Sequence, residues 1–212
     1  GSEMCIRDRI MPAGYTERWI QGPGDHVGSA FSGAAQLGTS GCGSEMPLYA
    51  VEHALSPEYQ AGPGMPNQNF IRDNSLLMVI ILTDEDDCST ELDEIEDQMC
   101  MDIMHPFAST TGDAGCTDAD GNDISDDYMP VTHYLSFLDD LMGGRNHWAA
   151  AVIAGRSSCE SSYGNAYTAH RLLRFVEGVG ENGVFHDICS HDLSSALDAA
   201  LGTLTVACDE YE

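Results

Sequence analysis

The stretch SLLMVIILTDEDDCS (residues 75–89) decides the fold that we expect for this chain of 212 residues. Its first part is a continuous apolar run that is partly β-branched. A run of this length without polar alternation is typical of a strand buried on both faces in the middle of a parallel sheet. Four acidic residues, Asp84 to Asp87, follow directly. Because ligand sites in open α/β sheets lie at the carboxyl ends of strands, this acidic tip is the first candidate functional site.

Segments with helical and strand patterns alternate on both sides of this run. The expected helices cover a short segment before Gly38 and residues 45–55, 91–101, 131–142, 166–179 and 192–207, and further strands cover residues 147–154 and 183–188. The N-cap expected for the second helix is Ser44. This order predicts an α/β fold with a doubly wound, mainly parallel sheet and helices on both faces. Residues 90–130 are expected to form an acidic insertion.

The composition is strongly acidic, with 35 Asp and Glu against 8 Lys and Arg, and a net charge of −27. All eight cations are Arg. Such a surface repels phosphate backbones and anionic lipid, so we expect no nucleic-acid partner, and cations are the natural ligands. Adaptation to a saline setting is an alternative reason for the same composition. No apolar run approaches the roughly 20 residues of a membrane-spanning helix, so we expect no membrane insertion.

Eight cysteines without a CxxC pair favour disulfides over zinc, and therefore a periplasmic, cell-surface or secreted protein. The first ten residues, GSEMCIRDRI, contain no apolar signal core and resemble an artefactual translation, so they are set aside together with Cys5. Residues 11–208 are expected to form a single domain that is truncated at its start, and residues 209–212 a tail. Seven cysteines then remain, and Cys208 is the expected unpaired one.

Three segments carry a resemblance to a known family: GTSGCGSEMPLYAVEHALS (38–56), FIRDNSLLMVIILTDEDDCS (70–89) and ICSHDLSSAL (188–197). Together they resemble the von Willebrand factor A domain, in particular the cysteine-containing type found in predicted secreted proteins and lipoproteins of myxobacteria and their relatives. The resemblance covers about residues 30–208.

The family carries a metal-ion-dependent adhesion site (MIDAS) at the carboxyl edge of its sheet. The resemblance implies that Thr39 and Asp84 hold Mg²⁺ or Ca²⁺, with Ser40 and Glu85 as tuning neighbours. Oxygen ligands of this kind suit hard divalent cations. It also implies a protein partner whose acidic side chain completes the coordination.

Two departures from the family pattern affect this expectation. The chain has no Asp-x-Ser-x-Ser loop, since the segments beginning at Asp123 and Asp192 both fail at the last position. That loop and the first strand are expected upstream of residue 1, which would leave the site weak or empty and one sheet edge exposed. The second departure is Glu85, which stands where the family usually has Gly.

The proposed fold also suggests disulfides. The pairs that it places close enough to bridge are Cys42 with Cys88, Cys100 with Cys116, and Cys159 with Cys189.

Several alternatives remain open at this stage. Asp84 to Asp87 are also expected to suit the N-terminus of the helix that follows them, without any metal. The loop from Asp118 to Asp127 alternates carboxylates as a calcium loop does, but its Gly and its closing residue do not fit an EF-hand. A structural module with a vestigial metal site is another possibility.

An enzyme is not expected, because the chain has no HExxH, Walker A or nucleophile-elbow motif. The alternative in this class is a hydrolase or thiol enzyme that uses Cys189 with His186 or His191. A disulfide at Cys189 is the more ordinary interpretation of that segment.

Overall fold

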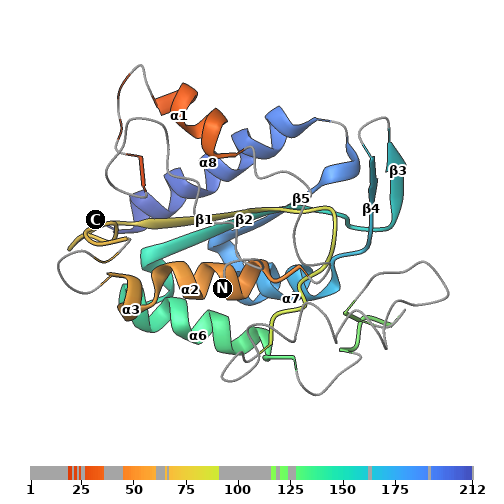
Figure 1. Ribbon diagram of the computed structural model, residues 1–212, viewed down its shortest axis with the longest axis horizontal. Coiled ribbons are helices and arrows are strands. Elements are labelled where there is room, and N and C mark those ends of the chain that lie inside the picture. Colours follow the sequence, from red (N-terminus) through yellow and green to blue (C-terminus); the bar gives the residue numbers. More distant parts are fainter. Residues whose placement is uncertain are drawn as a thin grey trace.

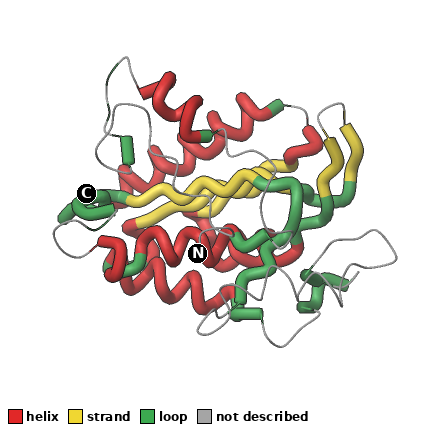
Figure 2. The backbone as a smooth tube through the Cα atoms, viewed as in Figure 1, coloured by secondary structure: helices red, strands yellow, loops and turns green. Residues whose placement is uncertain are grey.

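The computed structural model describes residues 19, 20, 22, 24, 27–35, 45–60, 65, 67–90, 116, 117, 120–123, 128–161, 164–190 and 192–211. Its centre is a parallel sheet of three strands, β1 (Leu77–Leu82), β2 (Trp148–Ala154) and β5 (Gly183–Asp187), in the order β1-β2-β5. Helices lie on both sides of this sheet (Figures 1 and 2). The chain is therefore an α/β protein, as the alternating pattern predicted.

The helices form two layers. On one side of the sheet lie α2 (Pro47–Leu55), α6 (Val131–Met142) and α7 (His170–Val179), and on the other lies α8 (Leu193–Tyr211) (Figure 1). The remaining elements are α1 (Val27–Ala34), α3 (Pro57–Gln60), η1 (Arg145–His147), the hairpin strands β3 (Cys159–Ser161) and β4 (Gly164–Ala166), η2 (Gly180–Asn182) and η3 (Ile188–Ser190). None of the helices in the described ranges is long and apolar enough to cross a membrane.

Strand β2 is buried on both faces along its whole length. Ala150, Val152 and Ala154 belong to the main core, which they share with residues of α2, α6 and α7. Because side chains alternate along a strand, the residues between them point to the opposite face, where α8 packs on β2. Among the α8 side chains that the structure describes, Ala196 and Ala200 are buried, and such small side chains let the helix approach closely.

Strand β1 occupies the edge of the described sheet, although its sequence is that of a strand buried on both faces. Val79 and Ile81 point into the core, but Ile80 is 50% exposed and Leu82 is 60% exposed. The reason is that β1 has a neighbouring strand on one side only, while α8 packs mainly on β2 and β5.

Element boundaries agree with the sequence patterns except at two helices. Helix α7 begins at His170 and not at residue 166, because Ala166 lies in β4 of an antiparallel hairpin that the apolar pattern did not predict. Helix α8 runs beyond residue 207 to Tyr211. As predicted, α6 ends at Gly143, whose φ of 80° is a left-handed conformation that suits glycine. The expected helix at residues 91–101 lies outside the described residues.

Candidate functional site

The acidic tip lies at the carboxyl edge of the sheet, immediately after β1. The backbone N–H of Tyr167 donates to the carbonyl oxygen of Asp84 at 2.8 Å, which fixes the tip against the segment that follows β4. Gly155, the residue after β2, makes this approach possible, because a Cβ atom there would lie 2.1 Å from the carbonyl oxygen of Tyr167. The ends of β1 and β2 are thus held together by close backbone contact.

Three carboxylates gather at this edge: Glu45, Asp84 and Glu85. The backbone N–H of Cys88 donates to the carbonyl oxygen of Glu45 at 2.7 Å, so the residues just before α2 are tied to the tip. Burial raises the pKa of Glu85 to about 7, with further contributions from the charges of Glu45 and Asp84. Partial desolvation and the charge of Asp84 also raise the pKa of Glu45. These side chains therefore form a locally repulsive negative site.

Of the two predicted metal ligands, only Asp84 can be placed. Its side chain is exposed at the sheet edge, as the resemblance implied, whereas Thr39 and its neighbour Ser40 lie outside the described residues. The Thr83 hydroxyl is engaged within the tip: it accepts a hydrogen bond from the backbone N–H of Glu85 at 3.1 Å and donates to the carbonyl oxygen of the same residue at 3.3 Å. Within the part of the chain that the structure describes, no three His, Cys, Asp or Glu side chains are arranged as a metal-binding group.

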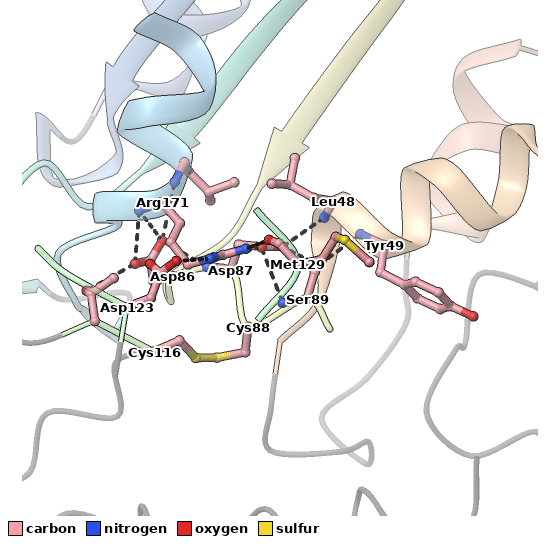
Figure 3. A network of polar contacts seen from close by, with 12 residues as sticks. Leu48, Tyr49, Asp86, Asp87, Cys88, Ser89, Cys116, Asp123, Met129 and Arg171 are labelled. Atoms are coloured by element: carbon pink, nitrogen blue, oxygen red, sulfur yellow. Dashed lines mark hydrogen bonds and ion pairs between the residues drawn. A yellow bond between two sulfur atoms is a disulfide. The ribbon is translucent and has the colours of Figure 1, made fainter. Parts of the chain in front are cut away.

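The next two carboxylates, Asp86 and Asp87, are fully buried and cap two helices from outside (Figure 3). Asp86 accepts hydrogen bonds from the backbone N–H groups of Arg171 (3.0 Å) and Leu172 (3.3 Å) at the start of α7. Asp87 accepts one from the backbone N–H of Leu48 at 3.0 Å, in the first turn of α2. Carboxylates at helix N-termini satisfy free N–H groups and interact favourably with the helix dipole.

This arrangement changes two expectations. Asp86 and Asp87 lie at helix N-termini, but these belong to α7 and α2, and the helix expected directly after the tip lies outside the described residues. Ser44 is not the N-cap of α2: that position is Met46, which makes no side-chain capping hydrogen bond. Besides Asp87, the Ser89 hydroxyl accepts from the backbone N–H of Tyr49 at 2.9 Å, so α2 is capped through tertiary contacts.

Arg171 is the centre of this network, and its side chain is completely buried. Its Nε donates to Asp87 at 3.2 Å, its Nη1 to Asp123 at 2.7 Å and its Nη2 to the carbonyl oxygen of Met129 at 2.7 Å (Figure 3). Burial raises the pKa of Asp87, and the hydrogen bond from Ser89 and the charge of Arg171 oppose that rise. A buried cation thus joins the strand tip to the segments at 123 and 129.

Arg171 also affects the alternative hypothesis of a calcium site in the acidic loop from Asp118 to Asp127. Asp123 pairs with Arg171 and also with Arg174, whose guanidinium additionally donates to the carbonyl oxygen of Gly121 at 2.6 Å. The carboxylate of Asp123 is therefore neutralised by two guanidinium groups. Three further carboxylates of this possible calcium loop lie outside the described residues, namely Asp118, Asp126 and Asp127.

The disulfide predictions are partly wrong. Cys159 is bonded to Cys189, as predicted, with a Cα–Cα distance of 6.3 Å. Cys88 is bonded to Cys116, with a Cα–Cα distance of 5.3 Å, so neither Cys42–Cys88 nor Cys100–Cys116 forms. The tertiary structure brings the segment at Cys116 against the strand tip. The spacing of the cysteines in the sequence does not indicate this position.

Two further cysteine predictions can be compared with the structure. Cys208 is a free and exposed thiol, as predicted. The alternative of a thiol enzyme required a free Cys189, and the bond to Cys159 leaves no thiol there. His186 faces the hydroxyl of Ser190 at 2.9 Å, and His191 lies outside the described residues.

Arg171 and Glu45 were not among the functional residues predicted from the sequence. One signal for Arg171 was available: it lies four and eight residues before Phe175 and Val179, on the buried face of α7. A charged residue on an apolar helix face indicates a buried ion pair. For Glu45 no comparable signal exists, because a carboxylate near a helix start is common.

The raised pKa of Glu85 predicts a pH-dependent stability difference. Above pH 7 the folded chain carries a repelled carboxylate, whereas the unfolded chain loses that proton near 4.5. The unfolded state therefore binds fewer protons between these values, and stability falls as the pH rises through this window. After solvent screening, we expect Glu85→Gln to raise the free energy of unfolding by about 1 kcal/mol at pH 8.

At pH 4 the gain from Glu85→Gln should vanish, because Glu85 is then mostly protonated in both states. Urea unfolding at the two pH values measures this difference. Glu177→Gln, on the exposed face of α7, is the matched control and should show no such dependence on pH. An equal effect of Glu85→Gln at both pH values would contradict the prediction.

Comparison with known proteins adds no relative: no protein-family model, curated protein or solved structure matches this chain.

Proposed function

We propose that this chain is a divalent-cation-dependent protein-binding module of an extracytoplasmic bacterial protein, with a doubly wound fold of the von Willebrand factor A type. In this proposal Asp84 and Thr39 hold Mg²⁺ or Ca²⁺ at the carboxyl edge of the sheet. An acidic side chain of a protein partner completes the coordination. The cell surface, the periplasm and the exterior are the compartments in which its disulfides persist.

The observation that carries the proposal is the gathering of Glu45, Asp84 and Glu85 at the end of β1. Burial of the Glu85 carboxyl, and then the charges of Glu45 and Asp84, raise its pKa to about 7, so negative charge is unfavourable there without a counterion. Hard divalent cations take carboxylate and hydroxyl oxygens as ligands. A bound cation would relieve the repulsion and would favour the ionised form of Glu85.

The carboxylates of the tip differ in their roles. Asp86 and Asp87 are buried and engaged with helix N-termini and Arg171, so they hold the tip in place. Asp84 is exposed at the surface of the tip, which leaves it accessible to a cation. Carboxylate oxygens are the type of donor that a hard cation prefers, and Asp84 with Glu85 would contribute them.

Calorimetric titration of Mg²⁺ and of Ca²⁺ tests this proposal. We expect Asp84→Asn to weaken the affinity at least about tenfold, which corresponds to about 1.4 kcal/mol. Asp73→Asn is the matched control: it removes one exposed carboxylate from the opposite end of β1 and should leave the affinity unchanged. Binding should also weaken from pH 8 to pH 6, because protons compete for Glu85.

Two results would count against the proposal. If both variants titrate like the unchanged chain, any cation lies away from the sheet edge and the adhesion-type site is wrong. If no heat of cation binding is found at millimolar concentrations, the structural alternative gains, in which the fold is retained and the metal site is vestigial. The observation that favours that second candidate is the engagement of Asp86 and Asp87 with helix N-termini and Arg171, since two of the four carboxylates of the tip then serve the fold itself.

A further inference from the structure

The Cys88–Cys116 disulfide and the buried ion pair of Arg171 join the same parts of the chain. Cys88 follows Asp87 in the strand tip, and Cys116 begins the described segment that leads to Asp123 (Figure 3). Thr117, next to Cys116, donates to Asp86 at 3.4 Å and forms a β-bridge with Asp123. The covalent bond and the ion pair therefore hold one short segment against the strand tip from its two ends.

The disulfide and the ion pair differ in their exposure to solvent. Both sulfur-bearing residues are buried, with Cys88 8% and Cys116 5% exposed. The Arg171 side chain is fully buried, whereas Asp123 is 30% exposed. Among the described residues, the guanidinium would keep only Asp87 as a charged partner, at 3.2 Å, if Asp123 were removed. A buried charge that loses a partner is strongly unfavourable, so the position of Asp123 matters to the whole network.

We propose that the Cys88–Cys116 disulfide is a redox-sensitive clamp on the Arg171–Asp123 ion pair. The oxidised bond restricts the segment at 116–123 to positions in which Asp123 reaches Arg171. The ion pair in turn keeps the segment closed over the disulfide. By linkage, each connection stabilises the other by the same free energy. The consequence is that the strand tip and the caps of α2 and α7 loosen when the chain is reduced.

The opening reaction is an ordinary thiol–disulfide exchange with a small dithiol such as dithiothreitol. A thiolate of the reductant attacks one sulfur of the Cys88–Cys116 bond, the S–S bond breaks and a mixed disulfide forms. The second thiol of the reductant then displaces the remaining cysteine. Two electrons and two protons pass to the protein, giving two thiols, and the reductant becomes a cyclic disulfide.

The test measures the rate of this reduction in the folded chain, by alkylating the new thiols and quantifying each cysteine peptide by mass spectrometry. We expect Asp123→Asn to speed the reduction of Cys88–Cys116 about fivefold or more. The Cys159–Cys189 bond of the same molecule is the internal control and should react at an unchanged rate. Asp140→Asn, on the exposed side of α6, controls for the lost charge and should change neither rate.

Asp123→Glu separates charge from packing, because it keeps the carboxylate. A rate near that of the unchanged chain is expected for it, and equal acceleration by Glu and Asn would overturn the proposal. So would an unchanged rate in Asp123→Asn, or an equal acceleration of both disulfides. If Asp123→Asn does not fold, Arg174→Met loosens the same carboxylate while Arg171 stays paired. It should then speed Cys88–Cys116 alone, about twofold, and no selective change would again reject the clamp.

Discussion

Replacement of Arg171 by Met is expected to lower the free energy of unfolding by about 3–5 kcal/mol. The substitution removes the guanidinium that donates to Asp87, Asp123 and the carbonyl oxygen of Met129. Asp87 would then remain as a buried carboxylate without its charged partner. Such a group must either stay ionised at high cost or take up a proton, so the loss should be larger at pH 8 than at pH 5.

Urea unfolding followed by circular dichroism measures this effect. Arg174→Met is the matched control, because Arg174 pairs with the same Asp123 but is 39% exposed. Exposed ion pairs contribute little, so we expect a loss below about 1 kcal/mol for it. Similar losses in the two variants would mean that burial does not set the importance of these arginines, and the assignment of Arg171 as the centre of the network would be wrong.

Among the glycines that the structure describes, Gly155 is the one at which an added methyl group, in Gly155→Ala, is expected to be most disruptive. Its Cβ would lie 2.1 Å from the carbonyl oxygen of Tyr167, a backbone atom that cannot move by a side-chain rotation. The same Tyr167 holds the carbonyl oxygen of Asp84, and Ala169 donates to the carbonyl oxygen of Gly155 at 2.9 Å. Overpacking of this kind costs about 1–3 kcal/mol, and we expect the upper end of that range.

Gly202→Ala is the control for this prediction, since it adds the same methyl group within α8, where nothing lies within 4 Å. Alanine is favoured over glycine in a helix, so this variant should gain up to about 1 kcal/mol. A loss of stability in Gly155→Ala together with a gain in Gly202→Ala, measured by thermal or urea unfolding, would confirm that the contact at Gly155 causes the loss and not the added methyl group itself. If Gly155→Ala is as stable as the unchanged chain, the backbones at Gly155 and Tyr167 are not packed this closely.

The regular elements were predictable because their sequences are locally informative. The apolar runs at β1 and β2 and the stripe of α6 specify strand and helix by their periodicity, and Gly143 marks a helix end. The hairpin of β3 and β4 was not predictable, because strands of only three residues on either side of a turn show no clear alternation of apolar and polar side chains. For the same reason the pattern placed the start of α7 four residues too early.

The candidate site was predictable only in its location. A strand that ends in four carboxylates indicates the functional edge of a parallel sheet, and Asp84 does lie exposed at that edge. The different roles of the four were not apparent, because they depend on which helix N-terminus lies opposite each carboxylate. Asp86 faces Arg171 of α7, 85 residues later in the chain, and Asp87 faces Leu48 of α2, 39 residues earlier.

The sequence by itself determined the α/β class, the apolar strands of the sheet, the acidic edge and the need for disulfides, since each follows from composition or from short-range periodicity. Only the tertiary structure decided that Cys88 bonds to Cys116, that Arg171 is buried among carboxylates and that β1 stands at an edge of the described sheet. These features join residues that are distant in the chain. Their energies depend on burial and on distances between side chains, which no local pattern encodes.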